Sequence, residues 1–225
     1  MGSAGASFLV VFGLLLPYLA IKSARRLATR PLPPKKPFFR SIIVQLLIFA
    51  AIAIVVGAVE HVDLFPRRAP SPAAWGWGLL ALTVFVLGMR PQWRKRVVER
   101  SRRAWLFMPR DGTERALWIG SSVAAGFSEE LVYRGVLTTL LFRMTGSFLA
   151  AALVSAAIFA ISHYMQAARS MTIIFGIALV FQALAWVSGS LYVPMAVHAV
   201  YDILAGLHYD YFGRKLGYPV EPLPA

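Results

Sequence analysis

Two adjacent carboxylates and an arginine lie inside an apolar stretch of the sequence. Glu129, Glu130 and Arg134 fall within a run from Ala116 to Phe142. Ionisable groups inside a membrane span are costly and mark function by default. Glu130 and Arg134 are four residues apart, so on a helix they share a face and can form an ion pair. Glu129 is rotated by about 100° from Glu130. We therefore expect Arg134 to neutralise Glu130 and leave Glu129 available to accept a proton.

Two histidines follow in later apolar runs. His163 lies four residues after Phe159, and His198 lies four residues before Asp202. The second spacing lets a carboxylate hold an imidazole N–H and fix its tautomer. A carboxylate, two histidines and an orienting acid suffice to activate a water and stabilise an oxyanion. A metal site of two histidines and one carboxylate, or a charge cluster that only holds helices together, are the alternatives.

The composition is that of a membrane protein. Hydrophobic residues make up 58% of the chain and charged residues 15%, well below the quarter typical of soluble domains. The absence of cysteine excludes disulfides and cysteine-ligated zinc. Several apolar runs approach the roughly 20 residues that cross a bilayer as a helix. They are Phe8–Ile21, Ser41–Val59, Ala74–Met89, Ala116–Phe142, Ser147–Ser162, Met171–Val187 and Leu191–Leu207. The sequence thus predicts an all-α, polytopic helical integral membrane protein with about seven transmembrane helices and the active site in the last four.

The net charge of +13 is concentrated in two loops, Ala20–Arg40 and Arg90–Arg115. Cytoplasmic loops are enriched in lysine and arginine, so both should be cytoplasmic and Glu60–Pro72 outside. We expect a multi-pass protein of the inner (plasma) membrane with its N-terminus outside and its C-terminus in the cytoplasm. Neither loop carries a nucleic-acid-binding motif. The basic loops are therefore expected to contact anionic lipid and not nucleic acid.

The expected organisation has three parts. Residues 1–115 carry the first spans and the basic loops, residues 116–208 carry the acids and histidines, and residues 209–225 form a disordered cytoplasmic tail. Apolar residues such as Trp93 and Trp105 alternate with charges in the second basic loop. An amphipathic segment lying on the inner leaflet explains this pattern, and a solvated helical face explains it equally well.

Together, the three motifs resemble the CPBP family of intramembrane proteases. The family includes the Ras-converting CAAX prenyl endopeptidase and bacterial Abi-type relatives linked to bacteriocin processing and self-immunity. The resemblance covers roughly Ala116 to Leu207. It rests on three patterns in order on successive apolar segments: Glu129-Glu130-x-x-x-Arg134, Phe159-x-x-x-His163 and His198-x-x-x-Asp202.

The resemblance implies a glutamic endopeptidase that hydrolyses a peptide bond of a membrane-associated protein or peptide. Glu129 and His163 would activate the water, and His198 with residue 202 would form the oxyanion site. The resemblance implies no metal cofactor, although the residues alone leave zinc open. A non-catalytic CPBP-like immunity or scaffold protein is one alternative function. A proton-coupled transporter is another, although the sequence has no evident repeat.

One position departs from the eukaryotic pattern, which has Asn where this chain has Asp202. An ionised carboxylate would repel an oxyanion, so we assign Asp202 to orienting His198 unless Asp202 is protonated. The remaining motif residues, Glu130, Arg134 and Phe159, would support the site.

The depth of the site poses a geometric question. If the fourth span begins near Ala116, Glu129 lies about 20 Å along the helix. His163, by contrast, is expected close to the cytoplasmic face. The two can meet if the helix starts deeper or tilts, or if a water-filled cavity opens from the cytoplasm, as in members of the family.

Overall fold

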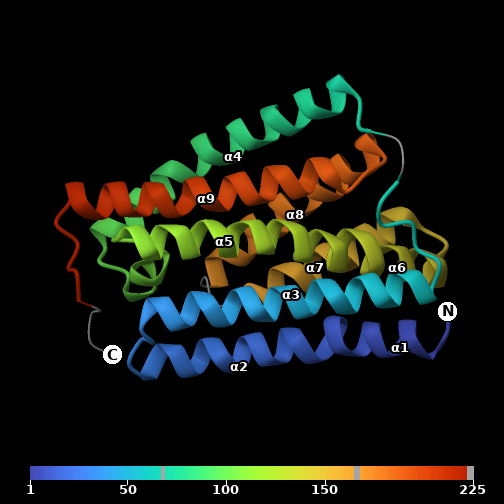
Figure 1. The fold of residues 1–225 in the computed structure, drawn as a ribbon, viewed down its shortest axis with the longest axis horizontal. Helices are drawn as coiled ribbons and strands as arrows, with labels where there is room; N and C mark the ends of the chain where they lie inside the picture. The colour runs from blue at the N-terminus through green and yellow to red at the C-terminus, as the bar shows by residue number, and fades with distance from the viewer. Residues whose placement is uncertain (67–68, 165–167, 222–225) are drawn as a thin grey trace.

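The computed structural model describes residues 1–66, 69–164 and 168–221, and this part of the chain is helical without any strand. The helices are arranged as seven rods (Figure 1). In chain order the rods are α1 (Ser3–Val10), η1 (Val11–Leu15) and α2 (Leu16–Thr29); α3 (Lys35–Val59); α4 (Pro72–Val98); α5 (Gly112–Glu129), η3 (Glu130–Leu137) and α6 (Thr138–Thr145); α7 (Phe148–Ser162); α8 (Ala168–Ser188); and α9 (Tyr192–Lys215). The short helix η2 (Arg102–Phe107) lies between the third and fourth rods. The predicted all-α class is confirmed.

The protein is a polytopic helical membrane protein. Among the described residues, four helices are long and apolar enough to cross a membrane: Ser3–Thr29, α3, α4 and the Met171–Ser188 part of α8. Helix α7 is apolar but shorter, with 15 residues. The rods that carry the acids and His198 are not among the four, because charged residues lower their hydropathy.

The rod that begins with α5 lies at the centre of the packing. Helix α5 packs against α3 on one side and α9 on the other, and α4 packs on the far side of α9 (Figure 1). Helix α7 packs against α6 and α8. The largest apolar core surrounds η3, where Leu131, Val136 and Leu137 are fully buried. The candidate site is therefore built next to the largest apolar core.

The segment η3 is a π-helix, in which the turn is one residue wider than in an α-helix. A backbone carbonyl group of η3 accepts hydrogen bonds from nearby hydroxyl groups. The Tyr133 carbonyl accepts from Ser155 Oγ at 2.9 Å and from Thr138 Oγ1 at 2.7 Å. These bonds satisfy buried backbone groups and hold the wide turn in place at the point where Glu130 enters the core.

The second basic loop differs from both expectations. Trp93 and Trp105 are buried in an apolar cluster with Tyr209, Phe212 and Tyr218. They therefore face neither lipid nor water. The reason is that α9 extends beyond its apolar run and offers these side chains a protein surface. Side chains pack more densely in a protein interior than against lipid headgroups.

Residues 209–221, which were expected to belong to a disordered tail, are folded against the bundle. Helix α9 passes residue 208 without a break and ends at Lys215. Beyond it, Tyr218 is buried and the Val220 carbonyl accepts a hydrogen bond from Trp105 Nε1 at 2.7 Å. The aromatic residues of the tail thus close the apolar cluster at the basic end of the bundle.

Candidate active site

The short helix α7 brings His163 to the level of the two glutamates. The chain reverses at Gly146, whose φ of 67° suits glycine, and Ser147 caps α7 by accepting from the Ala150 N–H. Fifteen residues span about 22 Å. Helix α7 therefore runs back along η3 and ends opposite the first residues of η3. His163 therefore does not lie at a face of the bundle. This register answers the question of depth raised by the sequence.

Glu130 is a fully buried carboxylate that accepts hydrogen bonds from two side chains. Its Oε1 accepts from Arg134 Nη1 at 3.1 Å and from His198 Nδ1 at 2.8 Å. The ion pair predicted from the four-residue spacing is confirmed. The Arg134 guanidinium lies over the rings of Phe159 at 4.5 Å and Phe181 at 5.2 Å, which stabilises its charge away from water. Phe159 thus contacts the site from α7.

Glu129 points away from this ion pair and lies between two imidazoles. Its Oε2 is 3.6 Å from His163 Nε2 and 3.7 Å from His198 Nε2. The same oxygen is buried and accepts no hydrogen bond from the described residues. Separations just above hydrogen-bond length between polar atoms fit a single bridging water. The carboxylate and the imidazoles are therefore arranged to share one small polar molecule.

Each imidazole is held by its Nδ1, which leaves Nε2 directed at Glu129. His163 Nδ1–H donates to the Phe159 carbonyl at 2.8 Å. His198 Nδ1–H donates to Glu130, and the ring stacks on Phe181 at 5.1 Å. In both cases a fixed acceptor selects the tautomer.

The partner that orients His198 is Glu130 and not Asp202. Asp202 Oδ2 lies 3.7 Å from His198 Nε2, beyond hydrogen-bond length and on the edge of the ring that faces Glu129. The four-residue spacing does bring Asp202 next to the ring, but the strong acceptor at 2.8 Å turns Nδ1 toward Glu130 of η3. The assignment of Asp202 as the orienting acid is therefore wrong. The sequence had no signal for the contact between Glu130 and His198, because the two residues lie 68 positions apart.

A cavity of about 120 Å³ opens onto this group. His163, His198 and Asp202 belong to its polar part. The rest of its wall is mostly apolar and aromatic, with Trp118 from α5, Ile173 and Ile177 from α8, and Tyr201 from α9. Apolar side chains of a substrate can therefore approach the two imidazoles from one side.

The comparison with protein families agrees with the motifs. Residues 112–204 match the family model described as type II CAAX prenyl endopeptidase Rce1-like. This segment is similar to that family. The match starts with α5, ends within α9 and contains every residue of the three motifs, so the resemblance to the CPBP family is confirmed over it. Neither the curated proteins nor the solved structures gave a match to the chain.

A close contact between α5 and α9 sets the distance across the site. At Gly126 an added Cβ would lie 2.7 Å from the Met195 carbonyl oxygen and from the Ala199 N–H nitrogen. These backbone atoms flank His198 in the chain, and Gly126 precedes Glu129 by one turn. Only glycine allows the two backbones to approach this closely, so Gly126 keeps Glu129 within reach of His198.

A metal site of two histidines and one carboxylate is the alternative use of these residues. No three histidine, aspartate or glutamate side chains in the described part of the chain are arranged to hold a metal ion. The absence of a metal cofactor stays a prediction.

Proposed function

We propose that this protein is an intramembrane glutamic endopeptidase that hydrolyses a peptide bond of a membrane-associated protein or peptide. One observation supports the proposal above all others. Glu129 Oε2 is a buried, unpaired acceptor that faces two imidazole nitrogens at 3.6 and 3.7 Å beside an open cavity. The Rce1-like match over the same residues supports a peptidase.

Water activation falls to Glu129 and His163 in this proposal. Both present an acceptor, because His163 Nδ1–H is already committed to the Phe159 carbonyl. One water can donate one hydrogen to each, so its lone pair points at the substrate carbonyl carbon. As the new C–O bond forms, Glu129 takes a proton from the water, and the π electrons of the substrate carbonyl move to the carbonyl oxygen. Glu129 then returns the proton to the amide nitrogen as the C–N bond breaks.

The oxyanion falls to His198 and Asp202. Glu130 accepts from His198 Nδ1, which favours the doubly protonated ring and leaves Nε2–H free to donate to the oxyanion. Asp202 lies beside that nitrogen with a side chain 32% exposed to the cavity. In its protonated form its carboxyl group supplies a second donor. The ion pair with Arg134 fixes the Glu130 carboxylate and so keeps His198 in place.

We further propose the orientation expected from the charge pattern. Both basic loops would lie on the cytoplasmic side of the inner (plasma) membrane, with the N-terminus outside. The basic loop between α4 and α5 is at the same end of the bundle as the C-terminal end of α9 (Figure 1). Under this orientation substrates would reach the site from within the membrane or from its cytoplasmic side.

The decisive experiment compares Glu129→Gln with the parent protein. The amide keeps the shape but cannot take a proton, so cleavage should fall by at least about 10²–10⁴-fold. Membranes that carry each variant would be searched by mass spectrometry for newly formed peptide ends, and any substrate found would be assayed with purified protein in liposomes. Glu99→Gln, an exposed glutamate on the second basic loop, is the matched control. Equal cleavage by Glu129→Gln and the parent would rule out the mechanism, and proton flux in the same liposomes without cleavage would favour a transporter.

The role of Asp202 is tested by two substitutions of similar size. Asn donates a hydrogen bond without needing a proton, so Asp202→Asn should retain cleavage within about tenfold, whereas Asp202→Leu should lose it. A large loss with Asp202→Asn, at an unchanged melting temperature, would mean that the negative charge itself is needed.

A further inference from the structure

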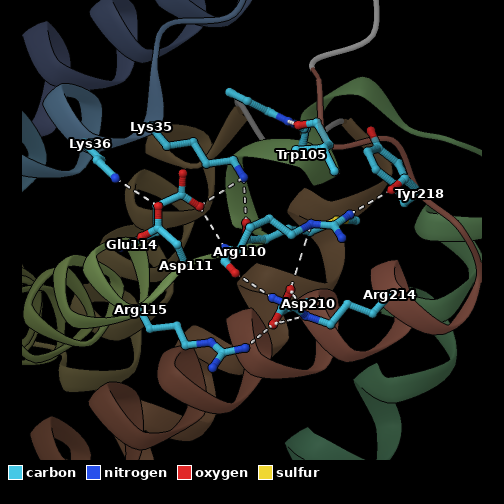
Figure 2. A network of polar contacts seen from close by, with 12 residues as sticks. Lys35, Lys36, Trp105, Arg110, Asp111, Glu114, Arg115, Asp210, Arg214 and Tyr218 are labelled. Atoms are coloured by element: carbon cyan, nitrogen blue, oxygen red, sulfur yellow. Dashed lines mark hydrogen bonds and ion pairs between the residues drawn. The ribbon is translucent and has the colours of Figure 1, made fainter.

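Many of the cations at the basic end of the bundle are engaged in internal contacts. Figure 2 shows Arg115 and Arg214 converging on Asp210, with donor–acceptor distances of 2.9 and 3.0 Å. Lys35 reaches Glu114 at 3.3 Å in the same network. Asp210 is buried, so these contacts tie α5 and α9 together. This network is part of the fold and has little charge left to offer a ligand.

A second group of cations faces an open groove between α4 and the end of α9. The groove is lined by Arg90, Arg94, Lys95 and Lys215 together with apolar residues, and no acidic residue is among its lining. Within the described chain, Arg90 and Arg94 form no ion pair. Lys95 pairs only with an exposed glutamate at 3.7 Å. The groove therefore gathers positive charge that the protein itself does not neutralise.

The groove continues an exposed apolar stripe of α4. Leu80, Val84 and Leu87 are more than half exposed, and their steps of four and three residues place them on one face of the helix. Arg94 lies seven residues after Leu87, on the same face. Since α4 is one of the membrane-spanning helices, this face meets lipid acyl chains and then ends in cations.

We propose that this groove binds the headgroup of an anionic phospholipid. Arg90 and Arg94 would hold the phosphate, because a guanidinium matches phosphate oxygens in geometry and charge. Lys215 would hold a second anionic oxygen from the α9 side, and the acyl chains would lie on Leu80, Val84 and Leu87. The apolar stripe selects a lipid over free phosphate, and the uncompensated charge selects an anionic headgroup over a zwitterionic one.

The groove differs from the first basic loop, where the sequence alone gives the same expectation of lipid contact. Lys22 and Arg25 on α2 are exposed, but they line none of the described cavities. They offer a diffuse charge to a surface, whereas Arg94 and Lys215 lie on two different helices across a defined groove. This contrast supplies the control for the experiment.

The test measures lipid binding to Arg94→Gln/Lys215→Gln and to the control Lys22→Gln/Arg25→Gln, which removes the same charge. Purified protein in neutral detergent would be titrated with dioleoylphosphatidylglycerol and, separately, dioleoylphosphatidylcholine, and bound lipid would be counted by native mass spectrometry. Each cation near an anionic headgroup contributes a factor of about five in affinity. The groove variant should therefore bind phosphatidylglycerol about 25-fold more weakly than the parent protein, and the control should stay within about twofold.

Three outcomes overturn the proposal. Equal losses of affinity for phosphatidylglycerol in the groove and control variants would show that the lipid responds only to net charge. Equal binding of phosphatidylcholine and phosphatidylglycerol by the parent would remove the selectivity for an anionic headgroup. Displacement of the lipid by millimolar inorganic phosphate would identify a phosphate site in place of a lipid site. The changed residues are all exposed, so the variants should fold, and Leu87→Gln provides an independent check because it should weaken lipid binding without removing any charge.

Discussion

The buried ion pair under the site leads to a specific prediction about stability. Glu130 is fully buried, and Arg134 is nearly so. Substituting Gln for Glu130 keeps the shape but leaves the guanidinium without its counter-charge between two phenylalanine rings. Removing one partner of a buried pair costs about 3–5 kcal/mol. For a chain of this length that corresponds to a fall of about 6–20 °C in the melting temperature.

The partner substitution and the double variant separate the charge pair from other effects. Arg134→Gln should destabilise less than Glu130→Gln, because His198 still donates to Glu130 at 2.8 Å. The double variant Glu130→Gln, Arg134→Gln should recover part of the loss, since it removes both buried charges. This recovery is the interaction energy that a double-mutant cycle measures.

The chain provides a matched control in Lys95 and Glu99. This pair has the same four-residue spacing, but its side chains are 60% and 56% exposed. Exposed pairs contribute little, so Glu99→Gln should leave the melting temperature nearly unchanged. Melting would be followed in detergent by the fluorescence of the six tryptophans. A Glu130→Gln variant that melts with the parent, or a double variant no more stable than Glu130→Gln alone, would refute the reasoning.

Three further predictions concern packing, topology and metal content. Gly126→Ala should lower the free energy of unfolding by about 1–3 kcal/mol, because the new methyl group meets backbone atoms of α9 at 2.7 Å. Gly176→Ala, with no atom within 4 Å, should be tolerated and serves as the control. Equal melting curves for the two variants would show that the close contact is unimportant. Reporter fusions at Pro33 and Ala69 should report opposite sides of the membrane, and the same side for both would disprove the topology. Elemental analysis of active protein should find no stoichiometric zinc, and a chelator should leave cleavage unchanged; one zinc per chain, with cleavage lost on chelation, would reverse this prediction.

The sequence predicted the helices well and their ends less well. Apolar runs bounded by charges and prolines mark helices by themselves, which is why all seven runs correspond to rods. The end of α9 was missed because Tyr209 and Phe212 alternate with polar residues, and only their contacts with Trp93 and Trp105 make them part of a core. Tertiary burial of this kind leaves no local signal in the sequence.

The site shows the same division between local and long-range contacts. Spacing within one helix predicted the ion pair of Glu130 with Arg134, because both residues lie on one short segment. Spacing also suggested that Asp202 holds His198, and this was wrong because the competing acceptor, Glu130, comes from another helix. Pattern reasoning within a helix lists the neighbours that a side chain can reach, but the choice between them depends on helix packing.

Helix packing at this site depends on two features that hydrophobic periodicity does not encode. The π-helical turn of η3 changes the angular spacing of the residues after Glu129, so angles taken from a 3.6-residue period no longer apply there. The glycine contact at residue 126 then fixes how closely α9 approaches. Since Glu130 holds His198 only across this contact, a methyl group at residue 126 should disturb the orientation of the imidazole as well as the packing. Loss of cleavage in Gly126→Ala that exceeds its loss of stability would show that the backbone contact positions the site and does not merely hold the fold.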